Sequence, residues 1–280
     1  MATIGTDPEV FLLDDTGEAV PSCGLVGGTK TNPKSLGGDG FFVQEDNVML
    51  EFNVPPSSTE EAFVTSIREG LTRCHDLVRT RGDGYSLYLG AEQWFSEDKL
   101  RSPQAMLFGC SPEFAAYSGG GMAPKVLPRD LEGEGGAYRF AGGHVHLGYD
   151  VSWEIPDHVA AKFADLFIGL RCVRFDKQGK RRELYGKAGR YRPTPYGIEY
   201  RTLSNSWLKT DDTARVVAAG AFALCKFLEN ADEDTVKRIY REIDWEHIER
   251  TINNEDEASA GLIYHALPER ISSAVWGVFS

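Results

Sequence analysis

The sequence has few cysteines, and none of them belongs to a CxxC pair. Five cysteines occur among 280 residues, an odd number spread widely along the chain. This pattern argues against a disulfide framework and against a zinc site built from thiolates. We expect reduced thiols in a cytoplasmic protein, at Cys23, Cys74, Cys110, Cys172 and Cys225.

Long apolar stretches and a secretory leader are also missing. The longest strongly apolar stretch, residues 216–228, is too short to span a bilayer and contains Lys226. The first eight residues include neither a basic region nor an apolar core, so we expect no Sec-type signal. No membrane partner is therefore expected.

Positive charge is in deficit. The chain has 30 Lys and Arg against 42 Asp and Glu, a formal charge of −12. A chain this acidic has no general attraction for a phosphate backbone, so nonspecific nucleic-acid binding is not expected, although a local basic site stays open. The balance of 41% hydrophobic and 26% charged residues is typical of a globular protein and excludes a disordered, collagen-like or coiled-coil chain.

The pattern along the chain mixes strands with helices. No repeat and no low-complexity linker interrupts it, so we expect a single domain over residues 1–280. We predict strands at 9–13, 42–54, 86–89, 142–148 and 197–203. We predict helices at 59–79, 156–175, 211–229, 232–243, 245–253 and 256–266. Residues 21–40 and 96–140 are irregular, and we expect substrate specificity to reside there.

Two details of these elements can be tested directly. Ser58 and Glu61 are predicted to form a capping box at the start of the first helix. If residues 42–54 form one continuous strand, Glu45 and Glu51 share one face and Asp46 lies on the other.

Several strands place polar residues two positions apart, which puts both side chains on one face of a sheet. Such a pair is usually the solvent face of a half-buried strand, and this interpretation stays open for each pair taken alone. Glycines at 142, 143 and 148 flank the histidine pair and would let a ligand approach the backbone. Carboxylates with imidazole suit Mg²⁺ or Mn²⁺, whereas no HExxH motif indicates zinc. The pairs are Asp7 with Glu9, His144 with His146, and Glu199 with Arg201.

A basic segment spans residues 180–192. It is either a solvated surface that balances nearby acidic residues or a clamp for phosphate, since arginine forks suit phosphoryl oxygens. Its cations are Lys180, Arg181, Arg182, Lys187, Arg190 and Arg192. Residues 24–30 do not fit a phosphate-binding loop, and we expect from them only a polar contact by Lys30.

Four short motifs carry a resemblance to a known family. They are residues 5–11 (GTDPEVF), 44–53 (QEDNVMLEFN), 142–148 (GGHVHLG) and 196–205 (YGIEYRTLSN). Their order resembles the phage-type COOH–NH₂ ligases (type 2 amidoligases) of the glutamine synthetase and glutamate–cysteine ligase superfamily. The resemblance spans residues 5 to about 208.

The resemblance implies an α+β fold in which a curved antiparallel sheet forms a glutamine synthetase-like half-barrel, with helices packed on its outer face. It implies ATP and two or three Mg²⁺ or Mn²⁺ ions as cofactors. The implied reaction phosphorylates a carboxylate and lets an amine attack the acyl phosphate, which yields an amide, ADP and phosphate. A phage origin, and with it the host cytoplasm, follows from the resemblance alone.

The resemblance also assigns roles to residues of this chain. It places metal ligands at Glu9, Glu51 and Glu199, with Glu45 or Asp46 as a further ligand and one of His144 and His146 on metal or phosphate. Asp7 stands where relatives carry a second glutamate on the first strand. Arg201 matches the arginine that stabilises the transferred phosphoryl group beside Glu199. The nucleotide contacts expected from the basic segment and its surroundings are Arg190, Arg192, Lys187, His146 and Lys30.

Other functions remain open at this point. The same carboxylates and histidines suit a metal-dependent hydrolase, and an inactive nucleotide- or peptide-binding relative would keep the fold. Glu113 is a candidate to bind the amine, with a surface position as the alternative. The motifs do not identify the acid, the amine or the oligomeric state.

Overall fold

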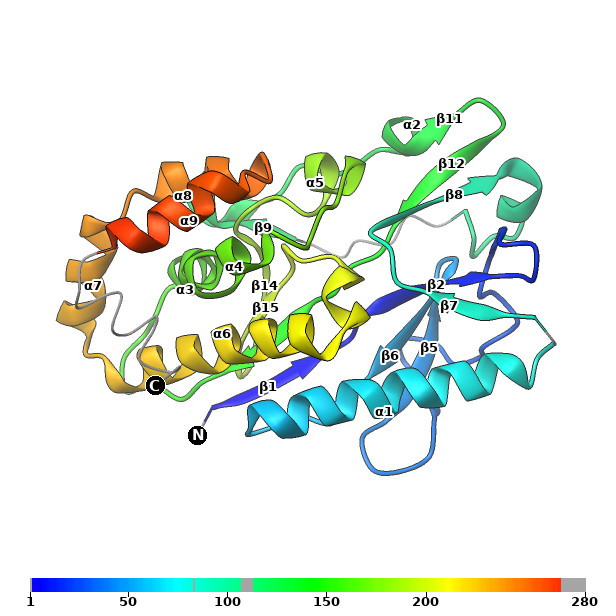
Figure 1. The fold of residues 1–280 in the computed structure, drawn as a ribbon, viewed down its shortest axis with the longest axis horizontal. Coiled ribbons are helices and arrows are strands. Elements are labelled where there is room, and N and C mark those ends of the chain that lie inside the picture. Colours follow the sequence, from blue (N-terminus) through cyan, green and yellow to red (C-terminus); the bar gives the residue numbers. More distant parts are fainter. Residues whose placement is uncertain (1, 83, 107–112, 268–280) are drawn as a thin grey trace.

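The computed structural model describes residues 2–82, 84–106 and 113–267, and Figure 1 shows how its elements are arranged. In this part of the chain the strands form antiparallel sheets of six, six and three strands. The longer strands are β1 (Thr3–Thr6), β2 (Glu9–Leu13), β5 (Phe42–Asp46), β6 (Met49–Asn53), β8 (Glu92–Ser96), β12 (Gly136–Phe140), β13 (Val145–Gly148), β14 (Arg190–Thr194) and β15 (Gly197–Tyr200). The short strands are β3 (Ala19–Val20), β4 (Lys34–Ser35), β7 (Ser86–Tyr88), β9 (Phe114–Ala115), β10 (Gly121–Met122) and β11 (Glu132–Gly133).

The first sheet has the order β1-β13-β15-β14-β9-β10, and we call it sheet 1. Its two faces differ sharply in chemistry because side chains alternate along each strand. Ile4, Leu147 and Ile198 lie opposite one another in the register, and all are fully buried in the main core. The other face has His146 opposite Glu199 and is polar. Sheet 1 therefore has an apolar outer face and a polar inner face.

The second sheet, sheet 2, has the order β3-β2-β6-β5-β4, and β7 pairs with β2. The chain passes from sheet 1 to sheet 2 through Asp7 and Pro8, which separate β1 from β2. Val10, Leu50 and Phe52 are fully buried and form a second core cluster. Glu9 lies directly opposite Glu51 on the other face. Polar inner faces on both sheets thus meet near Pro8.

Residues 42–54 are not one strand, which corrects the prediction. β5 and β6 form a hairpin in which Gln44 pairs with Glu51 and Asp46 pairs with Met49. Asn47 occupies the turn with φ of 56°, a left-handed conformation that asparagine tolerates better than most residues. The two-residue turn reverses the alternation, so Asp46 shares the face of Glu51 and Glu45 lies on the opposite face.

Helices cover the outer faces of both sheets. α1 packs beside α6, and α3 and α6 contact strands of sheet 1 (Figure 1). A π-helical turn at Asp165–Gly169 joins α3 to α4. The helices are α1 (Glu60–Arg79), α2 (Pro128–Leu131), α3 (Asp157–Ala164), α4 (Leu170–Cys172), α5 (Lys180–Leu184), α6 (Asp211–Asn230), α7 (Glu233–Glu242), α8 (Trp245–Asn253) and α9 (Glu257–Ala266). The curved antiparallel sheet with helices outside confirms the predicted α+β fold class.

Helix α1 illustrates why these segments fold as they do. Phe63, Ile67 and Cys74 recur at helical spacing and are fully buried, and burying an aromatic or branched side chain contributes roughly 2 kcal/mol. The residue that caps the helix is Thr59, whose side chain accepts a hydrogen bond from the Ala62 amide. The capping box predicted at Ser58 and Glu61 is therefore wrong by one residue.

The irregular segment predicted at 96–140 contains more structure than expected. β12 pairs with β8 and β11 in the three-stranded sheet, which is the part of the molecule around β8 and β12 in Figure 1. Trp94 lies opposite Tyr138 in this pairing, and their rings contact edge to face with centroids 5.0 Å apart. Aromatic side chains thus organise a segment whose glycines and prolines indicated a loop.

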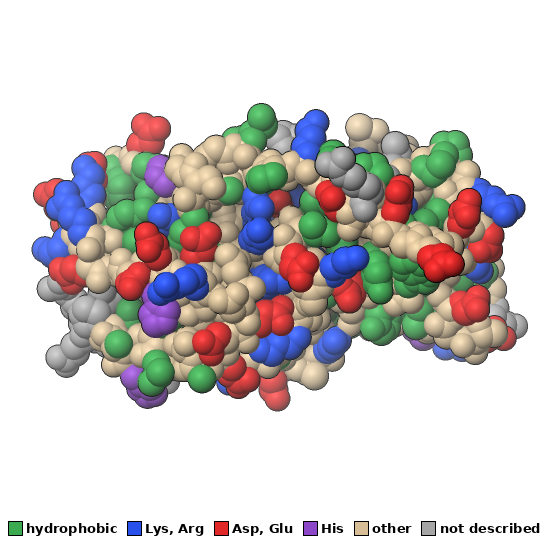
Figure 2. Space-filling view, turned by 90° about the horizontal axis from the view of Figure 1, so that it is seen from above, with side chains coloured by type: hydrophobic (Ala, Val, Ile, Leu, Met, Phe, Trp, Pro, Cys, Tyr) green, Lys and Arg blue, Asp and Glu red, His purple; other side chains and the backbone are tan. Residues whose placement is uncertain are grey.

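The charge, membrane and cysteine predictions concern the molecule as a whole. Figure 2 shows acidic and basic side chains intermingled over the face seen from above, so positive charge is not gathered into one broad area of that face. None of the described helices is long and apolar enough to cross a membrane. Cys23, Cys74, Cys172 and Cys225 are free thiols, and Cys110 lies outside the described residues.

Candidate active site

Two groups of acidic and histidine side chains lie on the inner faces, one on each side of Pro8. The first group is Asp7, His146 and Glu199, and the second group is Glu9, Asp46 and Glu51. Within each group, one ligand atom per residue lies within 4.8 Å of the others. Asp7 and Glu9 are predicted to share one face of a strand, and the structure instead assigns one of them to each group.

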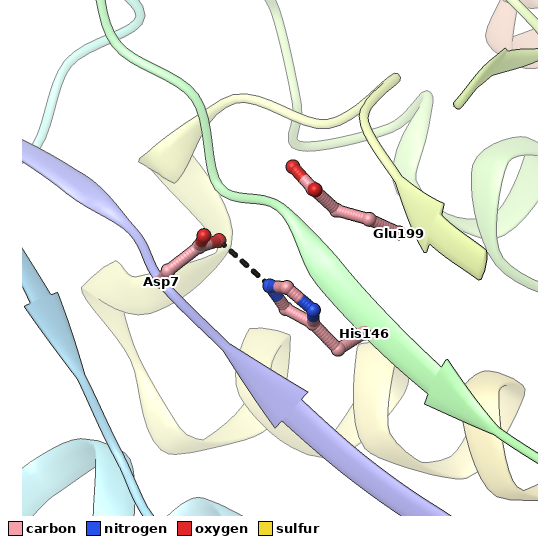
Figure 3. A group of neighbouring side chains, drawn as sticks. All are labelled: Asp7, His146 and Glu199. Carbon is pink, nitrogen blue, oxygen red and sulfur yellow. Dashed lines mark ion pairs between the residues drawn. The ribbon is translucent and has the colours of Figure 1, made fainter. Parts of the chain in front are cut away.

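The strand register assembles the first group. His146 on β13 lies opposite Glu199 on β15, which in turn lies opposite Arg192 on β14. Figure 3 shows Asp7, at the end of β1, turned toward His146, with an ion pair of 3.1 Å between Asp7 Oδ1 and His146 Nε2. His144 directly precedes β13, and its Nδ1 lies 3.6 Å from Asp7 Oδ1 and 3.3 Å from Glu199 Oε1. The two predicted histidines therefore converge on one aspartate.

Arginines balance the negative charge of the first group. Arg192 Nε donates to Glu199 Oε2 at 2.6 Å, and Arg201 Nη1 donates to Glu199 Oε1. Burial raises the pKa of Glu199, but the charges of Arg201, His144 and His146 together outweigh it and the net pKa is lowered. Glu199 is thus ionised and held on both oxygens, and the predicted pairing of Glu199 with Arg201 on one face is observed.

The two histidines differ in charge. Burial and the neighbouring Arg201 lower the pKa of His144 to about 4, so His144 is neutral near pH 7 and can accept or ligate. Burial also opposes the charged form of His146, but Asp7 overcomes this effect and raises the pKa of His146. Burial raises the pKa of Asp7 while His146 and His144 lower it, and the net pKa lies below the usual value.

The second group has an excess of negative charge. Burial and the charge of Asp46 raise the pKa of Glu9 to about 7, against a hydrogen bond of 2.5 Å from the Gly142 amide to Glu9 Oε2. Burial and nearby carboxylates raise the pKa of Glu51 well above its usual value, and Gln44 Nε2 donates to Glu51 Oε1 at 2.8 Å. Among the described residues, no arginine or lysine forms an ion pair with this group.

A divalent cation fits the second group. Three carboxylate oxygen donors, two from buried residues and one from half-buried Asp46, are a ligand set that Mg²⁺ and Mn²⁺ prefer, and a bound cation would relieve the repulsion that raises these pKa values. Of the cations predicted from the sequence, Lys30 acts on this group through its charge, which lowers the pKa of Asp46 and of Glu51. Lys30 is exposed and therefore does not replace a bound ion.

Arg190, Arg201 and Glu113 form a further charged cluster beside the first group. Arg190 is buried, and its Nε and Nη1 atoms make no hydrogen bond in the described structure. Arg190 Nε lies 3.8 Å from Glu113 Oε2, and Arg201 Nε lies 3.3 Å from Glu113 Oε1. Glu113 therefore neutralises two arginines, and its role in binding the amine stays a prediction.

Some predicted residues do not join either group. Glu45 turns away, accepts hydrogen bonds from the amides of Val26 at 3.2 Å and Gly27 at 2.7 Å, and so anchors the preceding loop. The prediction that Glu45 lies in phase with Glu51 is wrong, and Asp46 takes its place. Lys187 is exposed, and its charge acts on Glu249 of α8.

Two arginines of the basic segment are structural. Arg181 donates to Gln178 and to the Thr202 carbonyl, and Arg182 donates to carbonyl groups and contacts Asp176. Both arginines are buried by these contacts, so they hold the loop before β14 instead of presenting free donors. Of the six cations, Arg190 and Arg192 are those that reach the site.

Three residues support the site without having been singled out. Asn205 Nδ2 donates to the Glu9 carbonyl at 2.7 Å, and Gln44 holds Glu51 as described. The Tyr196 hydroxyl lies 2.6 Å from His146 Nδ1. All three belong to the quoted motifs, but their amide and hydroxyl groups have no pattern that separates support of the site from ordinary polar packing.

A comparison with family models connects this geometry to known proteins. Residues 134–244 match the family described as phage phiEco32-like COOH.NH2 ligase-type 2. This match, over residues 134–244, supports the predicted family. The ligase match includes His144, His146, Arg192, Glu199 and Arg201, whereas Asp7 and the second group lie before it. It supports a carboxylate–amine ligase, which acts on a carboxylate and an amine. No curated protein matches the chain.

Proposed function

We propose that this protein is an ATP-dependent carboxylate–amine ligase of the glutamine synthetase and glutamate–cysteine ligase superfamily. The γ-phosphoryl group of ATP passes to an oxygen of the substrate carboxylate, which gives an acyl phosphate and ADP. The amine then attacks the acyl carbon and phosphate leaves, so an amide bond forms. One observation carries this proposal. The carboxylates of the second group repel one another unless a cation binds, and the arginines around Glu199 on the adjoining sheet are suited to binding phosphate.

The second group is the place for the metal ions. Glu9, Asp46 and Glu51 would hold Mg²⁺ or Mn²⁺, and Asp7, His146 and Glu199 form a second candidate set of ligands. A bound divalent ion supplies charge that offsets the repulsion between the triphosphate and the substrate carboxylate. Neutral His144 places Nδ1 beside Asp7 and Glu199, where Arg201 Nη1 also lies within hydrogen-bond distance at 3.3 Å.

The arginines act on the transferred group. Arg192 and Arg201 are fixed in orientation by Glu199, so they are positioned before the phosphoryl group arrives. The unpaired donors of Arg190 lie where phosphate oxygens would satisfy them, with Glu113 as the anion that they face in the absence of phosphate. Lys30 adds positive charge at the second group.

The same proposal places the protein in the cytoplasm of the host of a phage. ATP and reduced thiols both belong to that compartment, and the described cysteines are free thiols.

ADP and phosphate release from ATP tests the proposal. The protein is incubated with Mg²⁺ or Mn²⁺ and pools of amino acids and peptides, and each product is weighed for the loss of one water. We expect stimulated release with a condensed product, and at least about a hundredfold loss of rate in Glu199→Ala, because Arg192 and Arg201 lose their common anchor.

Glu183→Ala is the matched control for that experiment, because Glu183 is exposed on α5. A folded Glu199→Ala protein with the full rate would contradict the role of Glu199. Hydrolysis of an amide without nucleotide would favour the metal-dependent hydrolase instead.

A further inference from the structure

A groove of about 330 Å³ opens directly beside the first group. Its walls come from β1, from the segment that follows Glu51, from the end of β13 and from the turn between β14 and β15. His146 belongs both to the first group and to the lining of the groove. Thr6 also lines it and immediately precedes Asp7. A molecule in this groove would therefore contact the first group.

Glycines keep the groove open next to His146. Gly5 lies directly opposite His146 in the register of β1 and β13, and Thr3 lies opposite Gly148. All four residues occupy the polar inner face of sheet 1, because they alternate with the buried Ile4 and Leu147. A Cβ on Gly148 would lie 2.5 Å from Thr3 Oγ1, so no residue with a side chain fits at position 148 without a shift of Thr3. The backbone itself forms the surface there.

The lining is uncharged apart from His146. It offers the hydroxyl group of Thr3, the amide of Asn53 and the apolar side chains of Val54 and Pro56, whereas the Thr6 hydroxyl already donates to the His144 carbonyl. Away from His146 the lining offers no charged partner, so burying a charged group against it would cost free energy. An uncharged group that combines apolar surface with one or two hydrogen-bonding atoms is the better match.

Tyr196 forms an aromatic wall of the groove. Its hydroxyl is held by His146 Nδ1 at 2.6 Å, yet 49% of the residue is exposed. An exposed ring with a fixed hydroxyl provides flat contact area for a ligand at little cost in side-chain entropy. The volume lies at the lower end of that of small-molecule pockets, which suits a group the size of one amino-acid residue.

We propose that this groove binds the uncharged, residue-sized arm of one of the two organic substrates. The reacting end of that substrate lies at the first group, and Thr3, Asn53 and Tyr196 select the arm. The preference of the groove for an uncharged arm is inferred from its lining residues alone. Its assignment to a ligase substrate rests on the proposed function, and the experiment separates the two.

Direct binding of blocked amino acids tests the proposal. The probes are N-acetyl amino-acid amides with uncharged side chains, and the N-acetyl amides of aspartate and of lysine are their anionic and cationic counterparts. Binding to the full chain is followed by ligand-observed NMR. We expect wild type to bind at least one neutral probe in preference to its charged counterparts. We expect Thr3→Trp, which fills the groove, to weaken that binding by at least about tenfold.

Thr65→Trp is the matched control, because Thr65 is exposed on α1. It should bind the neutral probe as wild type does. Thr3→Asp is a second variant that introduces a charge without bulk, and it should weaken the neutral probe as well. If the neutral probes fail to bind wild type, bind no better than charged ones, or bind both Thr3 variants unchanged, the proposal is overturned.

A parallel titration of wild type with ADP and Mn²⁺ distinguishes the two claims. Binding of the neutral probe without binding of ADP would support the groove and count against the ligase. Binding of ADP without binding of any neutral probe would support the ligase and overturn the groove. In the screen for ATP turnover, a Thr3→Trp protein whose KM rises for only the acid or only the amine identifies which substrate carries the arm.

Discussion

Glu113 lies against two arginines, Arg190 and Arg201, which the proposed function assigns to phosphate. Its carboxylate faces Arg190 Nε at 3.8 Å and Arg201 Nε at 3.3 Å, and all three side chains are largely buried. An arriving phosphate must therefore compete with a like charge. The carboxylate either moves aside or repels the ligand, and both cost binding free energy.

The substitution Glu113→Gln should relieve this competition. We expect ADP and inorganic phosphate to bind more tightly by about fivefold to tenfold, or about 1 kcal/mol, measured by isothermal titration. Glu183→Gln, on the exposed side of α5, should leave both affinities unchanged. Weaker binding in Glu113→Gln would mean instead that Glu113 positions the arginines for phosphate.

Binding of Mn²⁺ should depend on pH through the second group. Burial and Asp46 raise the pKa of Glu9 to about 7, and a carboxyl must lose its proton before it binds a metal ion. Affinity for Mn²⁺ should therefore rise as the pH increases from about 6 to about 8, and binding should release protons. Titration calorimetry in buffers of different ionisation enthalpy measures both effects.

Two neighbouring substitutions distinguish Mn²⁺ binding at the second group from nonspecific attraction of the ion to an acidic protein. Glu51→Gln should weaken Mn²⁺ by at least about tenfold, because one of three carboxylate donors is lost. Glu45→Gln should leave Mn²⁺ affinity intact, because Glu45 lies on the opposite face of the hairpin. Equal losses in the two variants would contradict the placement of the metal site.

The π-helical turn between α3 and α4 contains a fully buried carboxyl. Asp165 accepts a hydrogen bond of 2.6 Å from the Tyr200 hydroxyl, and burial raises the pKa of Asp165 to about 7. A carboxyl whose pKa is higher in the folded state stabilises the fold most at low pH. That contribution is lost as the pH rises from about 4 through about 7.

Asp165→Asn should flatten this pH dependence. Between pH 4 and pH 7, the free energy of unfolding of wild type should fall relative to that of the variant by roughly 2 to 4 kcal/mol. Urea unfolding at several pH values measures the difference in slope, which a uniform loss of stability in the variant would not produce. Asp39→Asn, in an exposed loop, should keep the wild-type slope, and parallel slopes for Asp165→Asn would contradict the account.

Strand alternation predicted most of the inner faces but failed at one turn. The alternation of His144 with His146 and of Glu199 with Arg201 placed these pairs correctly, because each pair lies within or directly beside a single strand. Residues 42–54 alternate just as regularly, and only Asp46 and Asn47 indicate a reversal. One unrecognised two-residue turn was enough to exchange Asp46 for Glu45, since it inverts the phase of every residue before it.

The helices were predicted more completely than the three-stranded sheet. Apolar spacing and capping residues are local signals, so the predicted helices at 211–229, 232–243 and 245–253 correspond closely to α6, α7 and α8. β8 and β12 are stabilised by each other, with Trp94 against Tyr138, although they lie far apart in sequence. That pairing is a tertiary effect and leaves little trace in either strand alone.

Across the molecule, the site depends on two sheets that meet at Pro8. The chain leaves sheet 1 after Thr6 and enters sheet 2 at Glu9, so Asp7 and Glu9 contribute to different groups. Sequence spacing alone predicted one shared face, because it does not show that a strand ends between them. The helices cover the outer faces and leave both polar inner faces to the site.

The division of charge between the two sheets is the core of the functional account. Sheet 2 presents carboxylates that need a cation, and sheet 1 presents arginines held by Glu199 that suit phosphate. The proposed function built on this arrangement has a phosphoryl group transferred to the substrate carboxylate before the amine attacks.

An oxygen-18 experiment tests that transfer most directly. The acid identified by ADP release is labelled in both carboxylate oxygens and turned over with ATP, Mn²⁺ and the amine, and the phosphate is examined by mass spectrometry. The account predicts one labelled oxygen in each phosphate released, because that oxygen leaves the acyl carbon with the phosphoryl group. Amide formation with unlabelled phosphate would contradict it.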